Sequence, residues 1–261
     1  MYSLSNHFRC FTFAKILNFQ IMKNLFLSAL SLLGLSSAVF GQSTPLYLGY
    51  NYETEITIYD TATYTITGTL SLTSDAGDVS GCYGLSLEPS TGDMYILYQL
   101  DDGAENDRNI GILDLTSGAI TDIGSVGNLN DIGFVYDDLY GTTGSTDGQN
   151  FYSVDKTDGS KTMLLSPSTD NEACGLIHNY FNGNVYYMDE DHFSLIDLET
   201  NTETLALGFP SFPEEVCSFV MLSETTALVG NYADLFLFNT PLHKSITALI
   251  CSAIKSDRVK L

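Results

Sequence analysis

The chain repeats one short phrase at a nearly constant spacing, and this repeat limits the folds open to it. An apolar stretch ends in an Asp, a Gly or Asn follows four residues later, and a Thr follows seven residues later. The phrase is complete after Asp114, Asp155 and Asp197, and Asn239 takes the anchor position of the next copy. These anchors are 41, 42 and 42 residues apart, a period typical of four-stranded propeller blades and repeat arrays.

Each repeat divides into four short stretches rich in β-branched and aromatic residues, separated by turn residues. We name the expected strands a to d in chain order. Complete repeats are expected over 83–123, 133–165, 175–207 and 218–250, after an incomplete unit with only b, c and d at 47–50, 56–60 and 64–70. The sequence therefore predicts an all-β fold, a β-propeller of about five four-stranded antiparallel blades. A closed ring of five blades and an incomplete piece truncated from a larger propeller are both compatible with this count.

The repeated phrase has a local physical reason. An Asp at a strand end accepts hydrogen bonds from backbone N–H groups two residues on, and a Gly or Asn tolerates the positive φ that a short hairpin often needs. We therefore expect Asp114, Asp155 and Asp197 to be structural and not catalytic. Strand c also carries a large apolar residue four positions before each anchor, and a second large apolar residue directly before the anchor. Packing between blades requires such residues.

The two ends of the chain differ from the repeats. Residues 22–41 combine a short basic start, an apolar run and small residues before Gln42, which is typical of a secretory signal peptide; the alternative is an N-terminal membrane anchor. The predicted division is an upstream extension plus signal peptide over 1–41, the propeller over 42–250 and a basic tail over 251–261. The tail is either a final pairing strand or foreign to the fold. This division predicts a secreted, periplasmic or cell-surface protein, with no membrane contact in its mature form.

Charge along the chain is very uneven. Between Gln42 and His243 there are 31 acidic residues and only three bases, Arg108, Lys156 and Lys161, a net charge of −28. Such a surface repels phosphate backbones, so nucleic acid is a poor partner. Solubility is one explanation of the charge, and cation binding is the other. In a propeller the b–c and d–a loops share a face, and 18 acids belong to it: Glu53, Glu55, Asp75, Asp78, Asp101, Asp102, Glu105, Asp107, Asp131, Asp147, Asp170, Glu172, Asp189, Glu190, Asp191, Glu214, Glu215 and Asp234.

One b–c loop is an insertion rich in oxygen donors. Its carboxylates are Asp101, Asp102, Glu105 and Asp107, and calcium takes six to eight such ligands. These four residues are the predicted metal site, although their spacing does not match the EF-hand loop and a solvated charge run is the simpler interpretation. A shorter acidic loop at 189–192 is a weaker candidate.

Cysteines and histidines offer little chemistry. Of the four cysteines after the predicted signal, Cys82, Cys174 and Cys217 begin the same type of strand, so we expect small buried thiols there. If a disulfide exists, neighbouring repeats favour Cys174–Cys217, and Cys251 completes an even count. His178 lies on an expected inner strand, where a satisfied core histidine is the common case. No nucleophile elbow, paired-histidine zinc motif or phosphate-binding glycine loop occurs, so an enzyme is the less favoured prediction.

Strand b begins with similar short sequences in several repeats, namely Leu-Tyr-Leu-Gly-Tyr at 46–50, Asp-Met-Tyr-Ile-Leu at 93–97 and Asn-Val-Tyr-Tyr-Met at 184–188. With these phrases, residues 46–250 resemble bacterial secreted propellers of the YVTN/NHL-like kind. The resemblance implies either a surface-binding, adhesion or scaffold protein, or a metal-dependent hydrolase of the gluconolactonase-like group. No metal ligand of that group can be placed on this chain. We expect a non-catalytic propeller whose acidic loop face binds an extracellular protein or glycan; the alternatives are the hydrolase and a truncated fragment without independent activity.

Overall fold

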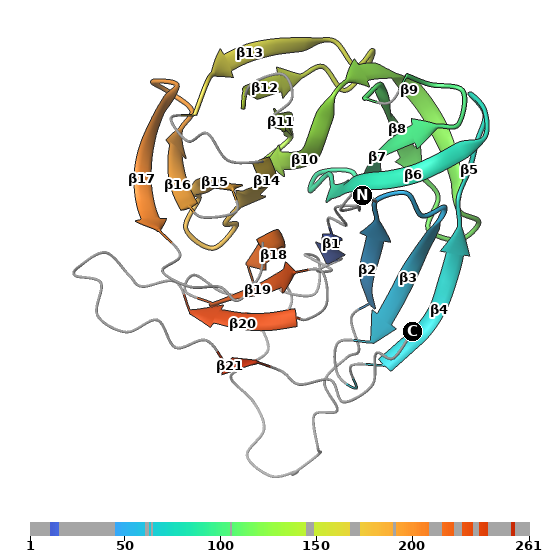
Figure 1. The fold of residues 1–261 in the computed structure, drawn as a ribbon, viewed down its shortest axis with the longest axis horizontal. Coiled ribbons are helices and arrows are strands. Elements are labelled where there is room, and N and C mark those ends of the chain that lie inside the picture. The colour runs from blue at the N-terminus through green and yellow to red at the C-terminus, as the bar shows by residue number, and fades with distance from the viewer. Residues whose placement is uncertain are drawn as a thin grey trace, which may run out of the picture.

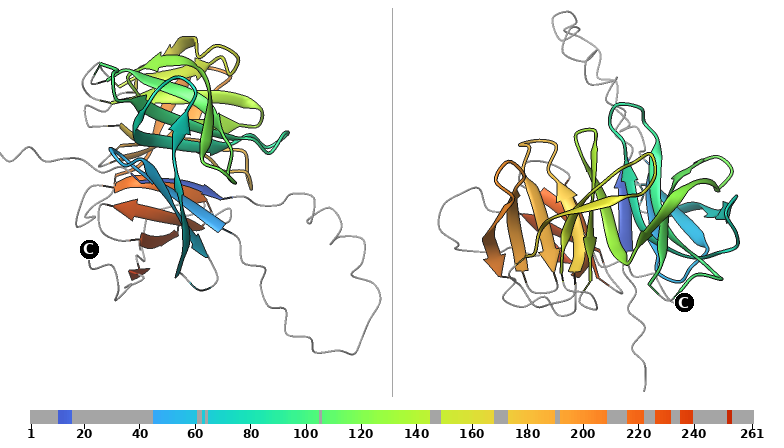
Figure 2. Two further views of the ribbon diagram at one scale, coloured as in Figure 1. Left: turned by 90° about the vertical axis from the view of Figure 1, so that its right-hand side faces the viewer. Right: turned by 90° about the horizontal axis from the view of Figure 1, so that it is seen from above.

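The computed structural model shows an all-β molecule, and the part of the chain that it describes contains no helix. The structure describes residues 11–15, 45–60, 63, 65–104, 106–144, 149–167, 173–189, 192–208, 216–221, 226–231, 235–239 and 252–253. The strands of these residues form five sheets around a common centre (Figure 1), and Figure 2 shows the same arrangement from two sides. The predicted β-propeller is confirmed.

Each sheet is built from consecutive segments and is one blade. Blade 1 contains β1 (Phe11–Lys15), β2 (Pro45–Tyr50), β3 (Glu55–Asp60) and β4 (Thr65–Ser71). Blade 2 contains β6 (Val79–Leu87), β7 (Met94–Leu100), β8 (Arg108–Leu113) and β9 (Ala119–Gly127), with β5 (Thr73–Ser74) parallel to β9 at its outer edge. Blade 3 contains β10 (Leu129–Val135), β11 (Asp138–Thr143), β12 (Phe151–Val154) and β13 (Lys161–Leu165). Blade 4 contains β14 (Ala173–His178), β15 (Val185–Asp189), β16 (His192–Asp197) and β17 (Thr202–Gly208). Blade 5 contains β18 (Val216–Met221), β19 (Thr226–Asn231), β20 (Leu235–Asn239) and β21 (Ser252–Ala253).

The ring closes through the first strand of the chain. Each inner strand contacts the next in the order β1, β6, β10, β14 and β18, and β18 contacts β1 again. The sequence left blade 1 without an inner strand, but β1 takes that position and pairs antiparallel with β2 from Phe11 opposite Tyr50 to Lys15 opposite Leu46. Of the two predicted forms, the described strands make the closed ring of five blades. β1 lies inside the 1–41 region assigned to extension and signal peptide, and that division stays a prediction.

The core lies between the blades, as expected from the apolar positions of strand c. Ile56, Ile110 and Phe151, each four residues before an anchor, have no exposed surface. They belong to three clusters of buried residues that fill the spaces between blades 1 and 2, blades 2 and 3, and blades 3 and 4. Each fully buried aliphatic side chain of this kind contributes roughly 1.5–3 kcal/mol, so adjacent blades stabilise one another.

The repeated phrase forms the same c–d turn in each described copy. The Asp114 carboxylate accepts a hydrogen bond from the Thr116 N–H at 2.8 Å, the Asp155 carboxylate accepts one from Thr157 at 2.8 Å, and the Asp197 carboxylate accepts one from Glu199 at 2.9 Å. The residues four positions later, Gly118, Gly159 and Asn201, have φ values of 80°, 77° and 51°. The prediction that the anchors are structural is confirmed for these three turns.

Two details differ from the sequence-based expectation. Strand d of the last repeat was placed at Ser245–Ile250, which lies outside the described residues, whereas β21 at Ser252–Ala253 pairs with β20 and lies in the region assigned to the basic tail. The expected equivalence of Cys82 with Cys174 and Cys217 is wrong by one residue. Cys174 and Cys217 are each the extra residue of a bulge in strand a, with no partner in strand b. In blade 2 the corresponding extra residue is Tyr83, because β6 contains a second bulge.

Candidate functional site

The b–c and d–a loops share one face, as the propeller assignment predicts. The Asp101 N–H donates to the Asp78 carbonyl at 2.8 Å, joining the b–c loop of blade 2 to the connection that enters it. The Ser125 hydroxyl donates to the Asp107 carboxylate at 2.6 Å, which ties the same loop to the end of β9. This face therefore carries the predicted acidic loops side by side.

The predicted metal residues share an exposed loop. Asp101, Asp102 and Asp107 are exposed, and Glu105 lies outside the described residues. Within the described part of the chain, no three His, Cys, Asp or Glu side chains are placed to hold a metal ion together. The calcium site stays a prediction, because one of its four residues is not described. Among the acids of the second loop, Glu190 and Asp191 also lie outside the description.

Carboxylates are not confined to this face. The a–b and c–d turns on the other face also carry exposed acids, namely Asp93, Asp114, Asp137, Asp138, Asp155, Asp158, Asp197 and Glu199. The sequence sorting considered only the loops of the first face. Both faces of the described ring are anionic.

The three bases of the repeat region all join blade 2 to blade 3. The buried Arg108 guanidinium lies over the Tyr83 ring at 3.9 Å and donates to the Leu129 carbonyl of β10. The Lys161 ammonium donates to the Val126 carbonyl at 2.7 Å, from β13 to β9. The third base, Lys156, lies in the c–d turn of blade 3 and contacts Glu88 in the a–b turn of blade 2. Their charges serve contacts between blades, a role that the sequence did not reveal.

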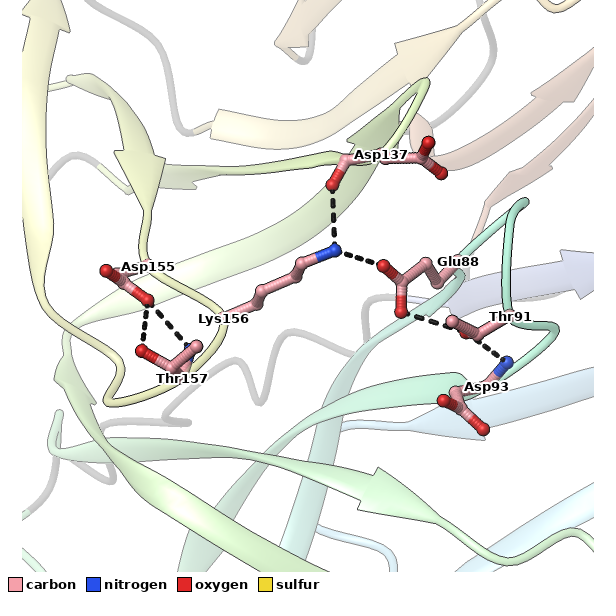
Figure 3. A network of polar contacts seen from close by, with 7 residues as sticks. All are labelled: Glu88, Thr91, Asp93, Asp137, Asp155, Lys156 and Thr157. Carbon is pink, nitrogen blue, oxygen red and sulfur yellow. Dashed lines mark hydrogen bonds and ion pairs between the residues drawn. The ribbon is translucent and has the colours of Figure 1, made fainter.

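The Lys156 ammonium has two partners, one from blade 2 and one from blade 3 (Figure 3). Its ammonium forms an ion pair with Glu88, which is 3% exposed, and donates to the main-chain oxygen of Asp137 at 3.1 Å. The other carboxylate oxygen of Glu88 accepts from the Thr91 hydroxyl at 2.9 Å. The hydrogen bond with Glu88 raises the pKa of Lys156, which therefore stays charged. A charge on a nearly buried carboxylate is thus balanced by a lysine from the neighbouring blade.

One row of residues crosses the inner strands at the same level. The pairing registers align five positions of strand a, the partners of Gly49, Leu97, Thr142, Met188 and Gly230: Thr12, Gly84, Asp131, Gly175 and Ser218. Asp131 is the one acid of this row. Its carboxylate accepts hydrogen bonds from the N–H groups of Ile132 at 2.8 Å and Leu176 at 3.0 Å.

The glycines beside Asp131 provide its space. A Cβ atom at Gly84 would lie 3.1 Å from one Asp131 oxygen, and a Cβ atom at Gly175 would lie 3.1 Å from the other. The carboxylate therefore bridges the inner strands of blades 2, 3 and 4. Burial raises its pKa to about 7, although the two backbone N–H donors act in the opposite direction. Asp131 was predicted to lie in a d–a loop, whereas it lies inside β10.

Among the cysteines and histidines of the repeats, the structure describes the side chains of Cys82 and His178. Cys82 is a free thiol and is buried, so the expected buried thiol is confirmed there; burial raises its pKa to about 12. The side chains of Cys174, Cys217 and Cys251 are not described. His178 ends β14 on an inner strand, as expected, and is 6% exposed. It is not a satisfied core histidine, because neither ring nitrogen makes a hydrogen bond of normal geometry.

No known protein family and no curated protein matches the sequence. Among solved structures, a chain in the crystal structure of a nidogen/laminin complex aligns with a TM-score of 0.46 at 10% identity, covering 74% of this chain and 89% of that chain. A similarity at this level carries no functional argument.

The described residues contain no helix long and apolar enough to cross a membrane.

Proposed function

We propose that the chain is an exported, non-catalytic binding or scaffold propeller, of the bacterial YVTN/NHL-like kind, that uses its b–c and d–a loop face. The partner is an extracellular protein or glycan that presents positive charge. One observation carries this proposal: Arg108, Lys156 and Lys161 are all engaged between blades 2 and 3, while Asp101 and Asp102 stand exposed on the loops. Exposed carboxylates attract and orient a cationic partner.

The test compares two variants that remove the same charge from opposite faces. Asp101→Asn/Asp102→Asn changes the proposed face, and Asp93→Asn/Glu199→Gln changes exposed acids of the other face. We expect the first variant to bind a lysine-rich peptide roughly fivefold more weakly, the size expected from losing two exposed ion pairs. The second variant should bind like the unaltered chain. Equal weakening in both variants would show a general charge effect and would contradict a dedicated face.

Calcium binding by the same loop is part of the proposal. Oxygen donors from Asp101, Asp102, Glu105 and Asp107 are the ligand type that calcium prefers. A ligand of the native state raises Tm by mass action, so millimolar calcium should raise the Tm of the chain and leave that of Asp101→Asn/Asp102→Asn unchanged. An equal shift in both proteins would place calcium elsewhere.

A further inference from the structure

Two neighbouring a–b turns bring aromatic side chains together on the face opposite the acidic loops. Tyr136 lies in the turn between β10 and β11, and Tyr180 and Phe181 lie in the turn between β14 and β15. These residues are 66%, 55% and 42% exposed. The inner strands β10 and β14 that carry the turns are in contact and lie side by side in Figure 1. We call Tyr136, Asp137, His178, Tyr180 and Phe181 the aromatic site.

Tyr136 occupies a conformation that its residue type disfavours. Its φ is 56°, in the left-handed region where a bulky aromatic residue is an outlier with a cost of roughly 1–3 kcal/mol. Its hydroxyl lies over the turn of blade 4, since a Cβ atom at Gly183 would be 3.1 Å from it. Backbone outliers of this kind recur at ligand-binding sites.

His178 forms the floor between the tyrosines. Its ring centroid lies 4.9 Å from that of Tyr136 and 4.3 Å from that of Tyr180. The Tyr180 hydroxyl donates to the Phe134 carbonyl at 3.2 Å. This hydroxyl therefore points inward, and the Tyr180 ring contributes the exposed surface.

The charge around this site is negative. Asp137 is exposed, and it raises the pKa of Tyr180, as does burial of the Tyr180 hydroxyl, the larger cause. Lys156 pairs its charge with Glu88 and binds the main-chain oxygen of Asp137 (Figure 3), and its charge also interacts with that of Asp137. Aromatic faces together with an exposed carboxylate attract cations.

We propose that the aromatic site binds an organic cation, either a quaternary ammonium compound or a lysine or arginine side chain of a partner. The rings of Tyr136, Tyr180 and Phe181 supply cation–π contact, and the Asp137 carboxylate supplies the countercharge. This site lies on the other face from the acidic loops, so its test is independent of the function proposed above.

The experiment uses the full chain and two probes of the same shape that differ in charge. Choline carries a quaternary ammonium, and 3,3-dimethyl-1-butanol replaces that nitrogen with carbon. We expect choline to bind roughly tenfold more tightly, the size of a partly desolvated cation–π contact, in titrations followed by the aromatic NMR signals. Two further probes are Nα-acetyl-lysine amide and Nα-acetyl-arginine amide, which keep their charged side chains. They distinguish a free quaternary ammonium ligand from a side chain of a partner protein. Equal binding of choline and its neutral counterpart, or no binding of any cation, would overturn the proposal; binding of methyl glycosides instead would assign the site to carbohydrate.

Three variants separate binding from folding. Tyr136→Gly should abolish choline binding while Tm stays equal or rises, because glycine accepts the positive φ without strain. Tyr52→Gly is the matched control, since Tyr52 is also exposed at 59% with a φ of 64° but lies in the b–c loop of blade 1. It should leave binding unchanged. Asp137→Asn should weaken choline and leave 3,3-dimethyl-1-butanol unaffected. Retained choline binding by Tyr136→Gly would refute the site.

Discussion

Asp131 occupies a row in which blades 2 and 4 have glycine. Its two oxygens take the space left by Gly84 and Gly175 and accept backbone N–H groups from two blades. An ionised carboxylate in this place is disfavoured by desolvation more than two hydrogen bonds can offset, which is why its pKa rises to about 7.

This raised pKa makes the stability of the ring depend on pH. Because the folded chain binds a proton at Asp131 more tightly than the unfolded chain does, the contribution of this group is greatest below its ordinary pKa and is lost as the pH rises through about 7. Between about pH 5 and pH 8, the Tm of the unaltered chain should therefore fall relative to that of Asp131→Asn, by a few degrees. Thermal unfolding followed by circular dichroism measures the difference. Parallel curves for the two proteins across that range would contradict a raised pKa.

The anchor aspartates behave in the opposite sense. Hydrogen bonds from the turn lower the pKa values of Asp114, Asp155 and Asp197, so their contribution is present above the ordinary pKa and is lost only as the pH falls below it. The two kinds of carboxylate can thus be separated experimentally, because Asp131 acts near neutral pH and the anchors act in acid.

At the scale of elements, blades 2 and 3 are joined by more than apolar packing. Replacing Lys156 with Met should lower Tm by several degrees, because the nearly buried Glu88 would lose its cation. Lys161→Met is the control: it removes a hydrogen bond to the neutral Val126 carbonyl and the cation–π contact with Tyr152, so its effect should be smaller. In the double variant Lys156→Met/Glu88→Gln, part of the loss should be regained. Additive effects of the two single changes would show that the pair is not coupled.

The inner strand of blade 1 supports a second prediction at this scale. A chain that begins at Met22 lacks β1, so β2 loses its partner and the contacts of β1 with β6 and β18 disappear. We expect a markedly lower Tm and faster proteolysis than in a chain that lacks only residues 1–10 and keeps β1. Equal stability of the two truncated chains would show that β1 does not close the ring.

For the whole molecule, the distribution of charge has a measurable consequence. The chain carries a formal net charge of −22, and the three bases of its repeat region are engaged between two blades. Self-repulsion of this kind is screened by salt, so raising sodium chloride from about 10 mM to about 0.5 M should increase Tm. Sucrose of equal osmolality is the control for effects that do not depend on charge. A Tm that salt leaves unchanged, or lowers, would show that repulsion does not limit the stability of the ring.

The closed ring contains β1, whereas the predicted signal-peptide cleavage would remove the segment in which β1 lies. β1 lies before the predicted cleavage point at Gln42, so a chain processed there would have blade 1 without its inner strand. The predicted signal peptide and the closed ring therefore describe different forms of the polypeptide. The N-terminal sequence of the mature protein distinguishes them.

Much of the architecture could be predicted from the repeat because its causes are local. Asp at a strand end, Gly or Asn at a positive φ and alternating apolar residues act within about ten residues, so the repeat predicted over 133–165 ends where β13 ends, at Leu165. The position of β1 could not be predicted, because its pairing with β2 joins segments separated by residues 16–44.

By itself, the sequence determined the all-β repeat, the number of blades and the structural role of the anchor aspartates, since these depend on hydrogen bonds and strand patterns within one repeat. Only the tertiary structure decided which carboxylate lies between the inner strands of three blades, where the three bases are placed, and that Tyr136 and Tyr180 meet over His178. These features arise between groups of different blades, from 21 to 68 residues apart in the chain for the three bases, and no local pattern encodes such a meeting.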